Sequence, residues 1–405
     1  MFVGLRSEEN ISPPFHFLLG HGLLHAQLWL NQGYSSNVAD PDPNLNKLLA
    51  SLPQSSPQAS FVSLEVSPPA IYARDYLTQA VCGLSNLVRL SVIGIPLGPS
   101  ALIHLCTLPR LHHLRFRAQS SDYPEDVHLQ PHSEPFPSLE ILTIDTDGAP
   151  CVTRLLPFLR PYTLDSLDIK LSTLPSHTEL TALSKAVAAL PCNETLGGLV
   201  YDFPGGPHQR HTASATLPWG AFVPLHDFPH IHTLRVYGDC YAAPSDADVA
   251  AMARAWPHLR ALSLCDQVAG STGISLAALL DLATRCDSLQ ELQIPLMDIT
   301  RADCEDILGR RPERWLDPAK PKRVLLSEVF SLNVGRAAIA DADVPAVAAV
   351  LSMAFPEVET VSHCWRQPMW GGENTDAVMY HRWQSVSVAL PAFLKVRSQE
   401  RNEAI

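Results

Sequence analysis

The sequence predicts an α/β solenoid, in which short parallel strands stack into one concave sheet and helices cover the convex side. Three observations predict it: a short apolar phrase recurs along the chain, the steps between copies are irregular but similar, and the segments between copies have helical character. With 46% apolar and 17% charged residues, the 405-residue chain has enough material for a continuous core. The fold class is therefore predicted from a repeat rather than from a single motif.

The recurring phrase is L-x-x-L-x-L or a close variant, and in five copies an apolar residue followed by proline precedes it, as in Phe228-Pro229. The first and last leucines of each L-x-L core point to the same side of a strand, because side chains alternate between the two faces. A single short strand cannot bury that side alone, whereas stacked strands from successive turns can. The ten copies span residues 87–92, 111–116, 139–144, 164–169, 196–201 (degenerate), 231–236, 259–264, 289–294, 329–334 and 358–361.

The steps between copies run from 24 residues (87 to 111) to 40 residues (289 to 329), which is typical of leucine-rich solenoids with one strand and one helix per repeat. Helices are expected where apolar residues follow a capping residue at helical spacing. These segments are 178–190, 245–256, 275–286 and 341–355. Longer loops or insertions are expected at 122–135, 203–227 and 300–323.

We expect three parts along the sequence. Residues 1–59 form an N-terminal segment and linker, partly disordered, because Asn31 to Ser60 is rich in Ser, Pro and Asn. Residues 60–365 form the solenoid. Residues 366–405 form a helical cap and tail, with one or two short helices interrupted at Pro391.

Charge and cysteine content narrow the function. A net charge of -12 disfavours binding to nucleic acid or to an anionic membrane surface. The nine cysteines are scattered without a C-x-x-C pair, which is typical of structural thiols in a reducing compartment. The apolar stretch 15–30 is too short to cross a membrane and lacks the flanks of a signal peptide, so we expect a cytoplasmic or nuclear protein.

The repeat spacing, the F-P-x-L-x-x-L-x-L phrases and the closing segment from Trp383 to Arg397 resemble the leucine-rich region of fungal F-box proteins, over about residues 60 to 400. The resemblance implies ribonuclease-inhibitor-like repeats that present a substrate, with an F-box that recruits a Skp1-type adaptor of a ubiquitin ligase. The L-P-x-E-[IL] opening of an F-box is not found in the first 59 residues. Either the F-box has been lost or the chain begins after it.

The most specific enzymatic candidate is the segment Asp145-Thr-Asp147, which follows an apolar strand. It resembles the nucleophile motif of haloacid-dehalogenase-type phosphatases. That motif requires Thr or Val where Ala149 stands. The structural alternative places Asp145 on the open face of a repeat strand and Asp147 in the turn after it. Local groups of histidine, such as His21 with His25, lack the spacing and geometry of a metal site, and no cofactor-binding loop is present.

The remaining candidates are the side chains between the consensus leucines, which face away from the core. Arginine and tyrosine among them are types enriched at binding hot spots, although any one residue can equally be a solvated surface position. Thr143 and Ser263 are expected to be exposed on the same face. The candidate binding residues are Arg89, Arg115, Arg117, Asp145, Asp168, Lys170, Arg235, Tyr237 and Gln293.

The leading hypothesis is a non-catalytic protein-interaction scaffold that binds a protein partner along the concave sheet, without cofactor or metal. As a substrate-recognition module of an SCF-type ubiquitin ligase it would also contact a Skp1-type adaptor, provided that an F-box lies upstream. The alternatives are a phosphohydrolase that uses Asp145 and Asp147, and a repeat remnant without an F-box and without ligase function.

Overall fold

The computed structural model describes residues 6–7, 25–31, 43–55, 58–67, 71–123, 135–204, 215–238, 240–264, 273–309, 329–358, 360–365 and 375–403. The protein folds as two compact units, Met1–Leu196 and Gly197–Ile405. Parts of the expected insertions (residues 124–134, 205–214 and 310–323) and the histidines at positions 21, 208 and 211 lie outside the described residues.

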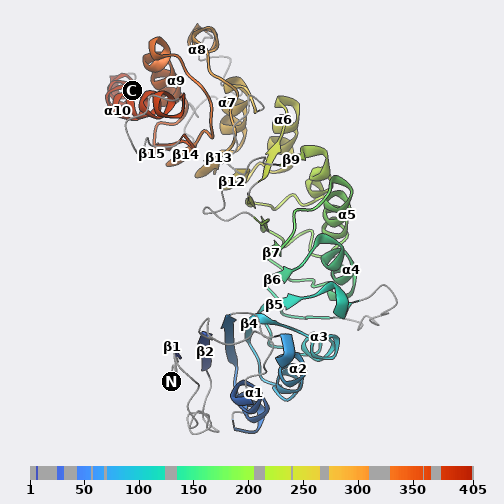
Figure 1. Ribbon diagram of the computed structural model, residues 1–405. Helices are drawn as coiled ribbons and strands as arrows, with labels where there is room; N and C mark the ends of the chain where they lie inside the picture. The colour runs from blue at the N-terminus through green and yellow to red at the C-terminus, as the bar shows by residue number, and fades with distance from the viewer. Residues whose placement is uncertain are drawn as a thin grey trace. The chain divides into compact units, whose positions relative to one another are not determined.

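In the first unit the strands pair side by side in sequence order, and all of these pairs are parallel. Helices pack against one another on one side of this sheet, as Figure 1 shows for α4 beside β6. The strands are β1 (Arg6–Ser7), β2 (His25–Asn31), β3 (Phe61–Ser67), β4 (Arg89–Pro96), β5 (His113–Ala118), β6 (Ile141–Thr146) and β7 (Ser166–Leu171). The helices are α1 (Pro43–Ser55), α2 (Arg74–Cys82), α3 (Pro99–Cys106), α4 (Ala149–Leu159) and α5 (His177–Ala188), with 3-10 turns η2 (Ile71–Ala73) and η3 (Ser120–Asp122).

The second unit repeats the arrangement. Its main sheet has the order β8-β10-β12-β13-β14-β15, again parallel, and β9 and β11 form a small parallel pair of their own. The strands are β8 (Gly198–Asp202), β9 (Ala215–Pro218), β10 (Thr233–Tyr237), β11 (Cys240–Ala243), β12 (Ala261–Leu264), β13 (Glu291–Gln293), β14 (Ser331–Asn333) and β15 (Thr360–Ser362). The helices are α6 (Asp246–Ala255), α7 (Leu276–Arg285), α8 (Arg301–Gly309), α9 (Val344–Ala354) and α10 (Thr375–Glu403), with 3-10 turns η4 (Trp219–Ala221), η5 (Val223–Asp227) and η7 (Asp341–Asp343).

Each of the ten phrases forms a strand, including the degenerate copy that becomes β8. Their consensus residues are buried: Leu90 and Val92 in the first copy have no exposed surface, and the last copy ends at Val361 with 8% exposed. Parallel strands with one apolar face turned to the helices are the arrangement that a leucine-rich solenoid requires, and the predicted fold class is confirmed within each unit.

The expected helices are also present, and serine caps explain where three of them begin. Ser176, Ser245 and Ser275 each accept a hydrogen bond from a backbone N–H in the first turn of α5, α6 and α7. In α5 and α6 an acidic residue bonds back to the N–H of the serine, which completes a capping box.

The stack includes strands that the phrase did not predict. β2 and α1 fall within residues 1–59, where we expected a linker, and β2 pairs in parallel with β3 from His25↔Phe61 to Asn31↔Ser67. In β3 every second residue is buried, namely Val62, Leu64 and Val66. This alternation is typical of a strand, but the segment does not match the L-x-x-L-x-L phrase.

The C-terminal cap is one continuous helix rather than the one or two short, interrupted helices expected. Pro391 lies inside α10 and is solvent-exposed, while Trp383, Val386 and Leu390 are buried. α10 packs on α9 and contacts β15. A proline on the outer side of a helix is tolerated when the inner side is held by packing, because the missing N–H bond then faces solvent.

Candidate functional site

The face of each sheet that lies opposite the helices, here called the open face, displays the side chains between the consensus leucines. In the first unit it carries six of the nine candidate residues, here called the charged surface. Strand register aligns them in rows: Arg117, Asp145 and Lys170 are neighbours across β5, β6 and β7. Two strand positions earlier, Arg115, Thr143 and Asp168 form a second row. The charged surface consists of Arg89, Arg115, Arg117, Asp145, Asp168 and Lys170.

Several of these charged side chains make defined contacts. The Nε of Arg115 donates to Oδ2 of Asp145 at 3.3 Å, and the hydroxyl of Thr143 donates to Asp168 at 3.5 Å. Arg89 lies 5.7 Å over the ring of Phe61 and 3.1 Å from the Nδ1 of His113. The charged surface thus combines one ion pair with polar and ring contacts to neighbouring side chains, and the guanidinium groups of Arg89 and Arg115 belong to β4 and β5.

Burial and neighbouring charges shift two pKa values on this surface. Burial raises the pKa of Asp168 above its ordinary value, and the charge of Asp145 adds to the rise while Lys170 opposes it. Burial also lowers the pKa of His113, and the nearby Arg89 lowers it further. Both pKa shifts favour the neutral forms of these two side chains.

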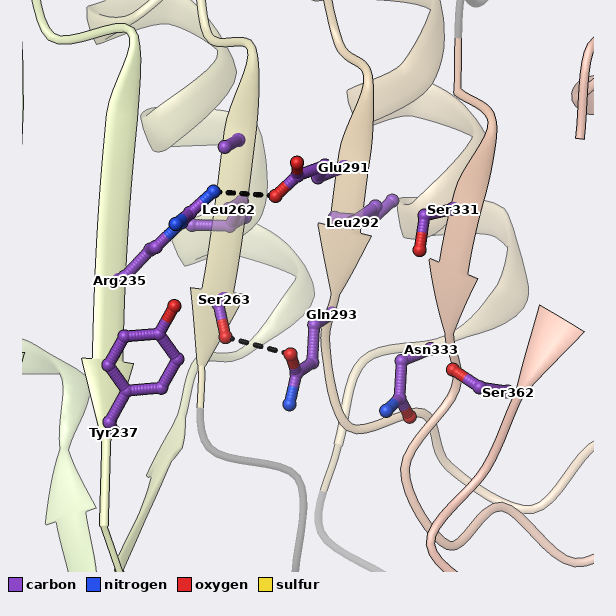
Figure 2. A pocket seen from close by; sticks show the side chains of 11 residues that line it. Arg235, Tyr237, Leu262, Ser263, Glu291, Leu292, Gln293, Ser331, Asn333 and Ser362 are labelled. Carbon is purple, nitrogen blue, oxygen red and sulfur yellow. Dashed lines mark hydrogen bonds and ion pairs between the residues drawn. The ribbon is translucent and has the colours of Figure 1, made fainter. Parts of the chain in front are cut away.

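The second unit carries the other three candidates, Arg235, Tyr237 and Gln293, and they line one groove of about 120 Å³ (Figure 2). The groove runs across β10, β12, β13, β14 and β15. Register places one residue from each strand in a row along it. We call this row, Arg235, Ser263, Gln293, Asn333 and Ser362, the polar row.

Hydrogen bonds fix the groove side chains. Arg235 donates to Glu291 at 2.6 Å, and the hydroxyl of Ser263 donates to the Oε1 of Gln293 at 3.0 Å, as the dashed lines in Figure 2 show. The Oδ1 of Asn333 accepts from the backbone N–H of Gly335 at 2.9 Å. Tyr237 at the β10 end is 39% exposed.

Two of the positions expected to be exposed are buried instead. Thr143 is 7% and Ser263 6% exposed. Both are short side chains with at least one longer neighbour in the row: Arg115 lies beside Thr143, and Arg235 and Gln293 flank Ser263. Neighbours across parallel strands are close enough to cover a short side chain, which the sequence pattern of one strand does not reveal.

Sequence reasoning also missed open-face residues. Ser362 lines the groove although the last phrase was followed only to Val361, and continuing the alternation by one residue would have found it. In the first unit, Phe61, Ser63 and Glu65 of β3 lie in register with β4. The sequence pattern that could have identified them is the alternation of apolar core residues with other residues along β3.

Asp147, the second acid of the phosphatase-like motif, accepts hydrogen bonds from the backbone N–H and hydroxyl of Ser120 and from the hydroxyl of Thr146. Asp145 is paired with Arg115 on the open face. The two carboxylates therefore occupy the positions of the structural alternative, one on the strand and one in the turn after it.

Over the described ranges, no group of three or more His, Cys, Asp or Glu side chains is arranged to hold a metal ion. The helices within those ranges include none that is both long enough and apolar enough to span a bilayer. Among the described cysteines, Cys106, Cys151, Cys192, Cys286 and Cys304 are buried free thiols.

No protein-family model matches this protein, and no curated protein matches it in sequence. Solved structures with a similar fold include an internalin from Listeria monocytogenes, with 13% identity, a TM-score of 0.38, and coverage of 85% of this protein and 79% of the internalin. The leucine-rich repeat-containing protein LegL7 from Legionella pneumophila has 14% identity, a TM-score of 0.37, and coverage of 96% and 98%. Because these values are low, the fold assignment rests on the strand registers and buried leucines of the protein itself.

Proposed function

We propose that this protein is a non-catalytic interaction scaffold that binds a protein partner along the open faces of its sheets. The observation that carries the proposal is the division of each phrase into two roles. The consensus leucines fill the core, while the residues between them form registered rows of hydrogen-bonding and charged side chains on the face opposite the described helices. Rows of this kind offer many weak polar contacts over several strands, which suits a macromolecular partner.

The charged surface is the part best suited to a direct test, and Arg89 and Arg117 are better targets than Arg115. Arg115 is paired with Asp145, so reversing its charge would bring two acids together and strain the fold. Arg89 is exposed, and the guanidinium of Arg117 has no ion pair within the part of the molecule that the structure describes. Reversing these two removes positive charge from β4 and β5 without breaking an ion pair that the structure describes. Arg117→Glu does place a second acid beside Asp145, its register neighbour, so thermal unfolding of the variant is measured alongside binding.

The experiment is quantitative affinity capture with the full-length protein. The Arg89→Glu/Arg117→Glu variant is compared with wild type and with Lys47→Glu/Lys185→Glu, which makes the same charge change at positions on helices α1 and α5. We expect proteins that wild type and the lysine variant retain and the arginine variant loses. The proposal fails if wild type retains nothing specifically, or if every retained protein survives changes on the open faces of both units.

The finer role that we propose is substrate recognition in an SCF-type ubiquitin ligase, in the cytoplasm or nucleus. It is supported by the resemblance of the F-P-x-L-x-x-L-x-L phrases to those of fungal F-box proteins. Because this role requires an F-box upstream, the test is to read the coding sequence upstream of Met1 for an F-box and to measure direct binding of the resulting protein to a purified Skp1-type adaptor. Absence of binding would remove the ligase role and leave the scaffold proposal standing.

A further inference from the structure

The groove in the second unit differs chemically from the charged surface of the first. Arg235 and Glu291 neutralise one another at 2.6 Å, and the other polar side chains that line the groove are neutral hydroxyls and carboxamides. A neutral site does not attract a phosphate, a nucleic acid or a strongly acidic segment. Its ligand should therefore be uncharged and rich in hydrogen-bonding groups.

The carboxamide of Gln293 has a defined orientation. Its Oε1 accepts the hydroxyl proton of Ser263 at 3.0 Å, and in Figure 2 its nitrogen lies on the side away from Ser263. The NH2 group is thereby presented in the groove as a donor. Asn333, the next residue in the polar row, is fixed in the same manner, because its Oδ1 accepts from the N–H of Gly335.

The carboxamides of Gln and Asn have the same hydrogen-bonding inventory as peptide groups, with a planar donor and acceptor. A row of fixed carboxamides and serines can therefore bond the backbone carbonyl and N–H groups of a segment laid along it. At about 4.8 Å between strands, the five residues of the polar row span roughly 19 Å, which is the length of about six extended residues. A continuous row of this length suits a linear ligand better than a compact one.

Tyr237 supplies the apolar contact at one end. Tyr237 is 39% exposed and borders the same groove as Arg235. Exposed tyrosine offers a large rigid surface together with a hydroxyl, and such residues are frequent binding hot spots.

We propose that the groove binds an extended, uncharged segment of a partner protein, whose backbone is hydrogen-bonded by the polar row and whose one apolar side group packs on Tyr237. This deepens the scaffold function proposed above and rests on it. The site is separate from the charged surface, so the two can succeed or fail independently.

The test uses a display library of short linear peptides, selected on the full-length protein. The decisive variant is Gln293→Glu, which keeps the acceptor for Ser263 but replaces the NH2 donor with a carboxylate oxygen. We expect the selected peptides to be uncharged and to bind the Gln293→Glu variant at least about ten-fold more weakly, because a buried hydrogen bond is lost. Tyr237→Ala should weaken binding comparably, and Arg89→Glu/Arg117→Glu should leave it unchanged. Unaltered thermal unfolding of each variant excludes loss of fold as the cause.

Backbone recognition has its own readout. N-methylation of an inner peptide bond of a selected peptide should weaken binding, whereas alanine at most inner positions should not. The proposal is overturned if wild type enriches no peptide over the Gln293→Glu variant, or if the enriched peptides carry acidic runs and are released by salt. Binding of an oligosaccharide array with the same dependence on Gln293 would also overturn it. Any of these results would leave the outcome at Arg89 and Arg117 as a separate measure of the scaffold proposal.

Discussion

Ser120 binds the carboxylate of Asp147 twice, through its backbone N–H at 3.1 Å and its hydroxyl at 2.7 Å. These bonds tie the turn after β6 to η3, the turn after β5. We expect Asp147→Ala to lower the free energy of unfolding by about 2 kcal/mol, because hydrogen bonds to a charged acceptor are lost and Ser120 is left without its partner. Urea unfolding at neutral pH measures it, and Asp165→Ala, at an exposed position in the same unit, should change little.

The same contact predicts a pH dependence. Burial raises the pKa of Asp147, but the hydrogen bonds from Ser120 and Thr146 outweigh it and hold the pKa below its ordinary value. A carboxyl group with a lowered pKa in the folded state stabilises the fold above its unfolded pKa, and this stabilisation is lost as the pH falls through the folded pKa. The difference between wild type and Asp147→Ala should therefore shrink in acid. A difference that stays constant or grows would contradict this role of the charge.

Gly94 lies where the register of β4 shifts relative to β5, between Ser91↔Arg115 and Pro96↔Arg117. Its φ is +86°, and a Cβ there would clash with the carbonyl oxygen of Val66 on β3. We expect Gly94→Ala to destabilise the protein by about 2 kcal/mol or more, since both the backbone conformation and the space favour glycine. Gly220→Ala is the matched control because nothing lies within 4 Å of its added Cβ. Equal unfolding midpoints for the two variants would argue against a required bulge.

Two tryptophans donate to one carbonyl at the C-terminal cap. The indole N–H of Trp383 donates to the carbonyl oxygen of Ala337 at 2.8 Å, and that of Trp365 donates to the same oxygen at 3.1 Å. Trp383 is fully buried, whereas Trp365 is partly exposed. We expect Trp383→Phe to cost about 2 kcal/mol through lost packing and one hydrogen bond, and Trp365→Phe to cost less. Limited proteolysis should release α10 first from the Trp383 variant, and equal protection of both variants would count against this anchoring.

The thiols should differ in reactivity. Burial raises the pKa of Cys106, Cys192 and Cys286 to about 12, so these thiols stay protonated and covered. Cys82 is exposed, although burial raises its pKa somewhat too. In the native protein at neutral pH we expect iodoacetamide to modify Cys82 first and the three buried thiols only after unfolding. Peptide mass mapping over time checks the order, and early labelling of Cys106 would show that its helix opens.

The sequence was sufficient for the repeating unit because burial is encoded locally. In Leu111-His-His-Leu114-Arg-Phe116, alternation alone assigns Leu114 and Phe116 to the core, and both are buried. The same argument holds for the degenerate copy around Leu199, which forms β8. The serine caps are equally local, because Ser245 needs only the residues of the next turn to start α6.

The pairing between strands, in contrast, could not be predicted from the local sequence of one strand. The pattern of one strand assigns Ser263 to the open face, but only the register with β13 places Gln293 beside it and buries it. The continuity of α10 through Pro391 likewise depends on what its inner side packs against. Local alternation thus determined which face each residue occupies. The tertiary structure decided which residues meet on that face, because neighbours across parallel strands come from positions about thirty to forty residues apart, whose registers no single phrase specifies.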